Sequence, residues 1–89
     1  MNDLTKGTRI YYGGDMANKS GFGSITEVIK DRWGTQYQIV LDDGRKMHIS
    51  ASNFSPEYLG HGGTRFVTEA AYNDWREVQM AAFRKWAGR

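Results

Sequence analysis

The chain has 89 residues, a length that corresponds to one small domain. Hydrophobic residues make up 39% and charged residues 25%, which excludes a disordered chain, and no run of about 18 apolar residues indicates a membrane-spanning helix. The absence of cysteine excludes disulfides and thiolate metal sites, and a formal charge of +2 is small for a dedicated nucleic-acid binder.

The residue pattern divides this single domain into three parts. Residues 1–6 are expected to be a flexible lead-in, residues 7–67 a β unit and residues 68–88 a helix. The start of the chain, MNDLTKGTR, lacks the basic and then apolar segments of a signal peptide, so we expect a cytoplasmic protein.

Residues 8–12 are expected to form the first strand, with Ile10 pointing inward. The glycine-rich segment that follows lacks the order of a phosphate-binding P-loop. Lys19 precedes Gly21 instead of following it, Asp15 would repel a phosphate, and a strand rather than a helix comes next. We interpret this segment as a long loop between two strands, whose glycines allow positive φ.

A hairpin is predicted from the alternation of apolar and polar residues around Gly44. A three-residue loop, 42–44, pairs Ile39 with Met47 and Tyr37 with Ile49, so that all four side chains share one face. Gly44 then takes the left-handed third position of the loop.

The same alternation of apolar and polar residues predicts a second three-residue loop upstream, at residues 32–34. It pairs Ile25 with Leu41 and places Glu27 on the inner face, opposite Ile39. Because an unpaired buried carboxylate is costly, either a β-bulge turns Glu27 outward or this residue lies at the rim of the sheet beside a cation.

The last third of the chain predicts a turn, a short strand and a helix. Ser52 and Asn53 favour a short helical turn, and residues 64–67 favour a final strand with Phe66 or Val67 inward. Thr68 is expected to cap the helix. Apolar residues then recur at helical spacing, namely Tyr72, Trp75, Val78 or Gln79, Ala82, Phe83 and Trp86.

The glycines and β-prone residues of residues 6–28, KGTRIYYGGDMANKSGFGSITEV, resemble the opening of an SH3-like small barrel of the KOW or Tudor kind. The matching residues are Gly7, Ile10, Gly21, Gly23, Ile25 and Val28, while YQIVLDDGRKMHI, residues 37–49, resembles the third and fourth strands. The resemblance covers about half of the chain and implies a mostly β fold, an antiparallel barrel of four to five strands, with one C-terminal helix. The chain as a whole also resembles short proteins carried by phages and plasmids.

Two groups of residues are candidates for binding. In such barrels the first long loop borders the ligand groove, which makes Tyr12, Asp15 and Asn18 candidate contacts for a partner. Trp33, beside Arg32 in a tight hairpin loop, is a candidate anchor, because an exposed tryptophan is a frequent hot spot of protein interfaces. A tryptophan folded back onto the sheet is the alternative.

Basic residues make nucleic-acid or anion binding the second interpretation. The candidate residues are Lys19, Lys46, Arg65, Arg84, Lys85 and Arg89. The last six residues, RKWAGR, carry three positive charges and no acid, which also suits the C-terminal end of a helix. His48 and His61, without cysteine, do not supply a metal site.

The sequence therefore predicts a small non-enzymatic binding module without a cofactor or metal, whose partner is a protein. A phage or mobile-element accessory protein that acts on a host macromolecule fits this prediction. The alternatives are a nucleic-acid-binding barrel and an oligomer that sequesters a nucleotide-like anion through the glycine loop and the turn LGHGGTR with Arg65. A homodimer through the C-terminal helix is a further possibility.

Overall fold

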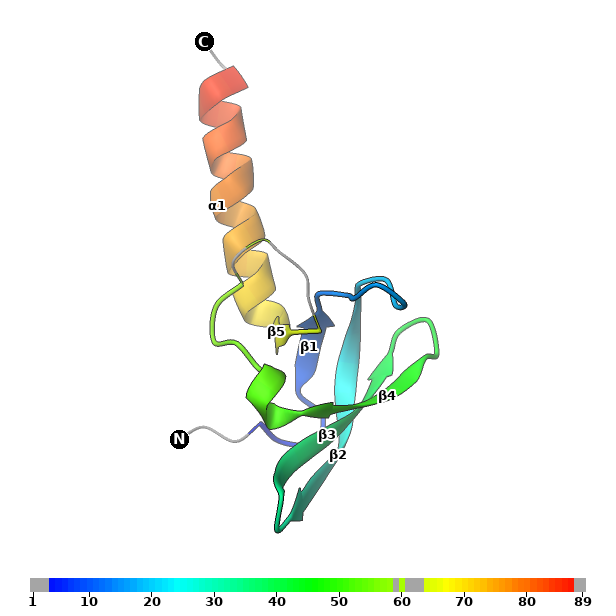
Figure 1. Cartoon of the computed structure of the whole chain (residues 1–89). Coiled ribbons are helices and arrows are strands. Elements are labelled where there is room, and N and C mark those ends of the chain that lie inside the picture. The colour runs from blue at the N-terminus through cyan, green and yellow to red at the C-terminus, as the bar shows by residue number, and fades with distance from the viewer. Residues whose placement is uncertain (1–3, 59, 61–63, 88–89) are drawn as a thin grey trace.

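The computed structural model describes residues 4–58, 60 and 64–87. Five strands form one antiparallel sheet in the order β4-β3-β2-β1-β5 and a single long helix follows them (Figure 1). The elements are β1 (Arg9–Tyr12), β2 (Gly21–Asp31), β3 (Gly34–Leu41), β4 (Lys46–Ser50), a short 3-10 helix η1 (Ala51–Asn53), β5 (Phe66–Thr68) and α1 (Glu69–Ala87).

The predicted mostly β fold with one C-terminal helix is confirmed, but the sheet is not closed into a barrel. Its two edge strands are β4 and β5, which do not pair with each other. The chain after η1 approaches β5 through a single bridge between Phe54 and Phe66, reinforced by a hydrogen bond from the Ser55 N–H to the Phe66 carbonyl at 2.9 Å. The likeness to SH3 barrels stays a prediction.

The hairpin between β3 and β4 has the register that parity predicts. Ile39 pairs with Met47 and Tyr37 with Ile49. Gly44 has a φ of +96°, the left-handed conformation that closes the three-residue loop.

The hairpin between β2 and β3 differs from its prediction by one residue. A bulge interrupts the pairing between Ile25 and Glu27, so that Ile25 faces Ile39 instead of Leu41. The bulge adds one residue to β2 and reverses the alternation beyond it, and a two-residue turn at Arg32 and Trp33 therefore replaces the predicted three-residue loop. The side chain of Glu27 points outward, 58% exposed and 3.8 Å from the ammonium group of Lys6, as the bulge alternative requires.

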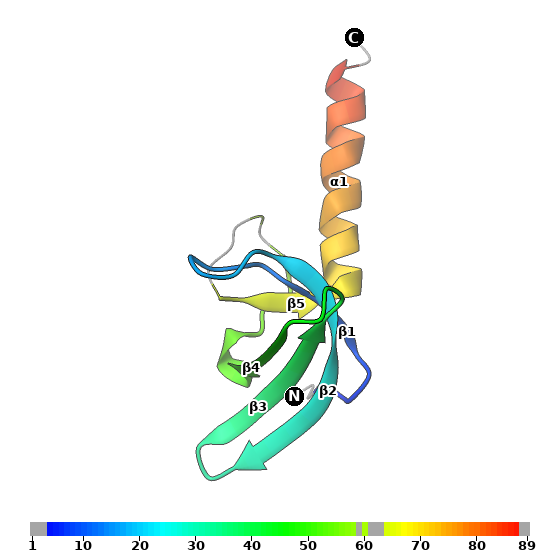
Figure 2. The ribbon, with the colours of Figure 1, turned by 90° about the vertical axis from the view of Figure 1, so that its right-hand side faces the viewer.

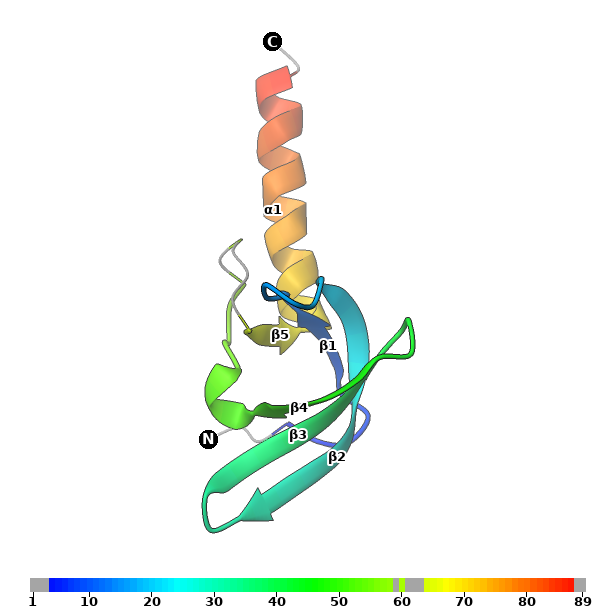
Figure 3. The same ribbon diagram turned by 45° about the vertical axis from the view of Figure 1, so that its right-hand side comes forward.

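The core lies on the inner face of the strongly curled sheet (Figures 2 and 3). Its buried residues come from all five strands and are Ile10, Tyr12, Ile25, Tyr37, Ile39, Leu41, Ile49 and Phe66. Ile10 points inward as predicted, and both Phe66 and Val67 are buried. Val67 pairs with Tyr11 in the sheet and so faces outward, where it lines a small hollow together with Tyr11 and Tyr58.

The helix α1 begins where the sequence predicts and then leaves the sheet. The Thr68 hydroxyl accepts a hydrogen bond from the Ala71 N–H at 3.1 Å, which caps the first turn. The helix meets the sheet at β1 and β5, where the ring of Tyr72 stacks on that of Tyr11 with centroids 3.9 Å apart. Beyond these turns α1 projects away from the sheet (Figures 1 and 2), and none of its described residues is fully buried.

Candidate binding surface

In the loop between β1 and β2, residues 13–20, the carboxylate of Asp15 accepts several hydrogen bonds. The Tyr12 hydroxyl donates a hydrogen bond to Asp15, and the backbone N–H groups of Ala17 and Asn18 donate to Asp15 Oδ1 at 2.7 Å each. The loop therefore brings together Tyr12, Asp15 and Asn18, the three contacts predicted from the sequence. Their polar groups are directed at one another, and Tyr12 is only 1% exposed.

These contacts shift the pKa values of both side chains. Burial, followed by the hydrogen bond to Asp15, raises the pKa of Tyr12 to about 12. The hydrogen bond from Tyr12, together with those from the backbone, lowers the pKa of Asp15 to about 2. Asp15 is therefore charged at neutral pH. Its carboxylate already accepts hydrogen bonds from Tyr12, Ala17 and Asn18, so this residue stabilises the conformation of the loop.

The tip of the β2–β3 hairpin presents an exposed and well-anchored tryptophan. Trp33 is 82% exposed, its backbone N–H donates to Asp31 Oδ1 at 2.8 Å, and the guanidinium of Arg32 lies 5.5 Å from the centre of its ring. Ile29, on the outer face of the same hairpin, is 39% exposed. Of the two alternatives predicted from the sequence, the structure therefore supports an exposed Trp33 and not a tryptophan folded back onto the sheet.

The five predicted partner contacts form two separate groups. The β1–β2 loop precedes the first residue of β2, and Arg32 and Trp33 follow the last residue of this 11-residue strand. In Figures 1 and 3 the loop and the hairpin tip lie at opposite ends of β2. One partner surface of small size cannot include both, and the hairpin tip is the group with its apolar side chain in solvent.

The basic residues of the second interpretation come from separate parts of the fold. Lys19 lies in the β1–β2 loop, Lys46 in β4, Arg65 just before β5, and Arg84 and Lys85 in the last turns of α1. Arg89 and His61 lie outside the described residues, as does most of the turn LGHGGTR. The projecting helix carries Arg84 and Lys85 away from the sheet (Figure 1), so they do not share a surface with Lys46.

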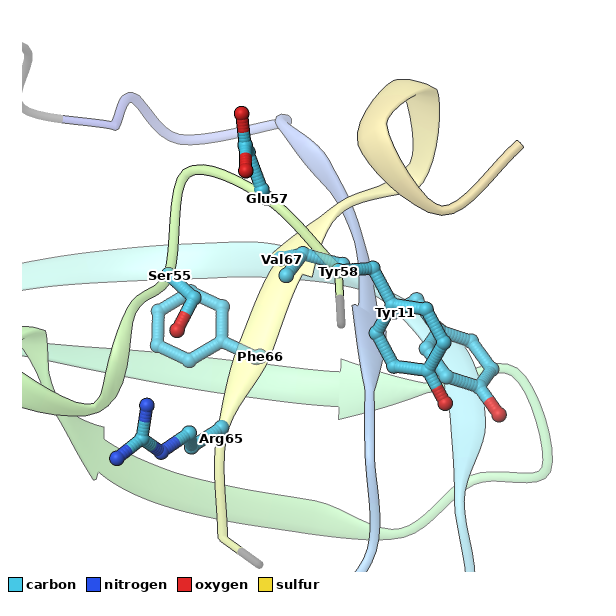
Figure 4. Close-up of a pocket in the computed structure, with 7 residues that line it drawn as sticks. All are labelled: Tyr11, Ser55, Glu57, Tyr58, Arg65, Phe66 and Val67. Carbon is cyan, nitrogen blue, oxygen red and sulfur yellow. The ribbon is translucent and has the colours of Figure 1, made fainter. Parts of the chain in front are cut away.

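A small hollow lies between β5 and the segment that follows η1 (Figure 4). Its walls are Tyr11, Ser55, Glu57, Tyr58, Arg65, Phe66 and Val67. Its volume is about 20 Å³, which holds about one water molecule and is far below the roughly 300 Å³ of a small-molecule site. Arg65 at its rim therefore does not make this hollow a nucleotide site.

A cluster of aromatic rings that was not predicted from the sequence joins the helix to the sheet. Tyr11 contacts Phe22 at 5.0 Å and Tyr58 at 5.6 Å between ring centroids, and Tyr58 contacts Trp75 at 4.7 Å. Burial raises the pKa values of Tyr58 and Tyr72. The sequence did contain a signal for this cluster. Tyr11 alternates with the inward-facing Ile10 and Tyr12, so its side chain points outward, and it pairs with Phe22 directly across β1 and β2.

The described residues contain neither a metal-binding cluster nor a membrane-spanning helix. Residues 4–58, 60 and 64–87 hold no group of three His, Asp or Glu side chains placed to bind a metal ion. In the same part of the chain, α1 is not apolar enough to cross a membrane.

Comparison with known proteins gives no relative of this chain. Neither a known protein family, nor a curated protein, nor a solved structure matches the chain.

Proposed function

We propose that this protein is a non-enzymatic module that binds another protein through the tip of its β2–β3 hairpin, with Trp33 as the anchor. The observation that carries the proposal is a tryptophan that is 82% exposed although its backbone is fixed by Asp31. Its position is set by a two-residue turn, so binding would not have to order a flexible loop.

The energetic argument rests on what Trp33 gains when a partner covers it. Burial of a large apolar side chain is worth about 3 kcal/mol, and tryptophan and arginine are the residues most enriched at interface hot spots. Arg32 stacks on the Trp33 ring and Ile29 extends the apolar surface along the hairpin. A protein partner with an apolar pocket and an acidic rim fits this arrangement, and a host protein bound by a mobile-element accessory protein is one such partner.

The test is quantitative affinity capture with the full chain and two variants. Trp33→Ser removes the anchor, and His48→Ala changes an exposed residue of β4 that takes no part in the proposed surface. We expect wild type and His48→Ala to retain a common protein from a lysate of the source cells, and Trp33→Ser to lose it. The captured protein is then purified, and its affinity for Trp33→Ser should be at least about tenfold weaker.

The variant is informative because the fold does not depend on Trp33. An exposed turn residue contributes within about 0.5 kcal/mol of stability, so Trp33→Ser should unfold in urea as the wild type does. An equal capture profile for all three proteins would move the partner surface elsewhere. Binding to random oligonucleotides that weakens steeply with salt would instead favour the nucleic-acid interpretation.

A further inference from the structure

The apolar stripe of α1 continues well beyond the part that the sheet covers. In the first half of the helix, Tyr72 packs on Tyr11 and Trp75 on Tyr58. Further along the same stripe, Val78 is 65%, Phe83 60% and Trp86 71% exposed. Trp86 lies eight residues after Val78 and three after Phe83, so it sits between these two side chains on one broad face of the helix.

The second half of α1 has no tertiary support from the described residues. Every residue from 76 to 87 is exposed, and α1 projects along the longest dimension of a molecule that measures 55 × 29 × 21 Å (Figures 1 and 2). The packed first turns supply the helix nucleus, but each residue of the free segment of about 12 residues adds only the small free energy of helix propagation, so this segment is marginal in water. A packing partner along the stripe would supply the missing stability.

The charges of α1 identify a second copy as that partner. Asp74 lies four residues before Val78 and lines the open groove there together with Glu57, while Lys85 lies seven residues after Val78 on the same edge of the stripe, near the end of the helix, where no acid accompanies it. An antiparallel pair of helices brings the basic end of one copy toward the acidic half of the other, and it also opposes the two helix dipoles favourably. A parallel pair would place like charges side by side.

Geometry sets the crossing point of such a pair near Ala82. This small residue lies on the stripe at the middle of the exposed half, so two helices can approach closely there, and the two sheets end up on opposite sides. Trp86 of the second copy then lies level with Val78. At Val78 an open groove of about 370 Å³, also lined by Pro56, Tyr58 and Trp75, continues the stripe.

We propose that two copies of this chain associate through the exposed halves of α1 in antiparallel orientation, with Trp86 of each copy seated beside Val78 and Trp75 of the other. The exposed stripe would bury roughly 1,000 Å² in total, which is at the low end for specific interfaces. The dimer is therefore expected to have a dissociation constant in the micromolar range. This surface is distinct from the hairpin tip, and the inference does not depend on the proposed function.

Sedimentation of the full chain between about 2 and about 200 µM tests the association. We expect the wild type to pass from monomer to dimer over this range, and its helix content to rise with concentration. The variant Phe83→Ser/Trp86→Ser should stay monomeric or dissociate at least about tenfold more readily. Met80→Ser is the matched control, because Met80 is 46% exposed on α1 but lies off the stripe, and this variant should dimerise as the wild type does.

Disulfide trapping tests the orientation, since the chain contains no cysteine of its own. In an antiparallel pair that crosses at Ala82, the Ala82→Cys variant should form a covalent dimer rapidly under mild oxidation. Gln79 lies on the same stripe, but its two copies would be separated by about 9 Å along the axis, so Gln79→Cys should cross-link slowly. Equal trapping at both positions would contradict the antiparallel arrangement.

Two further results would overturn the proposal. One is a monomer at every concentration. The other is self-association that Phe83→Ser/Trp86→Ser leaves unchanged. If a monomeric wild type bound anionic lipid vesicles and the double variant did not, the occupant of the stripe would be a membrane surface instead. Because Trp33 is intact in all these variants, loss of dimerisation and loss of partner capture at the hairpin are separate outcomes.

Discussion

At the scale of single residues, Gly23 shows how closely β2 and β3 approach each other. A Cβ atom at this position would lie 2.7 Å from the Val40 carbonyl oxygen and 2.9 Å from the Leu41 Cα. Both are backbone atoms of a central strand and cannot turn aside as a flexible side chain can. A side chain at Gly23 would therefore have to separate the two strands.

We expect Gly23→Ala to destabilise the protein by about 2 kcal/mol or more, because it overpacks a rigid site. Gly21→Ala is the matched control in the same strand, since its Cβ would meet only the end of the Arg45 side chain, at 3.4 Å. Urea unfolding of the two variants measures the difference. Equal stabilities would show that the sheet can relax around a methyl group at Gly23.

Asp15 makes the β1–β2 loop sensitive to acid. Its pKa in the folded protein is about 2, below the ordinary value of 3.8, chiefly because the Tyr12 hydroxyl donates to it. A lowered folded-state pKa means that the stabilisation is fully present above about pH 4 and is lost as the pH falls through about 2. The loss occurs when protonation removes the charge that these donors favour.

The prediction is a steeper acid dependence for the wild type than for Asp15→Asn. An asparagine keeps an oxygen that can accept from Ala17 and Asn18 but carries no charge to lose. Urea midpoints measured from about pH 5 to about pH 2 should fall more for the wild type, so that the two proteins converge in acid. Parallel curves would mean that the charge of Asp15 contributes nothing to the loop.

At the scale of elements, Arg9 connects the start of the helix to the sheet. Its guanidinium pairs with both oxygens of Asp42, at 2.7 and 2.8 Å, and its Nε donates to Glu69, the first residue of α1, at 3.2 Å. Arg9 also lowers the pKa of Asp42. One side chain of β1 thus joins the end of β3 to the N-terminal turn of the helix.

We expect Arg9→Met to lower the urea midpoint by about 0.4 M, because methionine keeps part of the stem but none of the donors. The effect should shrink in 1 M salt, about the concentration at which partly exposed charge pairs are screened. Lys6→Met is the matched control, since the Lys6–Glu27 pair is 3.8 Å long and largely exposed, and it should leave the midpoint unchanged. The same shift in both variants would show that Arg9 does not act through its geometry.

At the scale of the whole molecule, Met16 in the β1–β2 loop is exposed singly, and the other exposed large apolar side chains of the described residues gather mainly in two distant places. Trp33 and Ile29 mark the tip of the β2–β3 hairpin, and Val78, Phe83 and Trp86 mark the far half of α1. The two places lie at opposite ends of the molecule in Figure 1. An antiparallel dimer through α1 would leave both hairpin tips free, so that one assembly could hold two partner molecules and gain in apparent affinity for a multivalent target.

The sequence by itself determined the kind and order of the elements, four to five strands followed by one helix. Alternating apolar residues around Gly44 predicted the β3–β4 register, and Thr68 marked the start of the helix, because both signals are local and depend on a few neighbouring residues. The exposure of Trp33 also followed from its place in a tight turn. For the proposed binding surface, local signals predicted the exposed hairpin tip but also named Tyr12 and Asp15, whose mutual hydrogen bond was not visible in the sequence.

Only the tertiary structure decided where the bulge in β2 lies, whether the sheet closes and how far the helix is covered. The cost of placing Glu27 against Ile39 indicated a conflict, but the bulge and the shorter turn that resolve it are a property of β2 and β3 together. The same apolar spacing runs from Tyr72 to Trp86, so periodicity could not distinguish the turns that pack on Tyr11 and Tyr58 from those left in solvent. That distinction comes from the size of the sheet, which ends before the helix does.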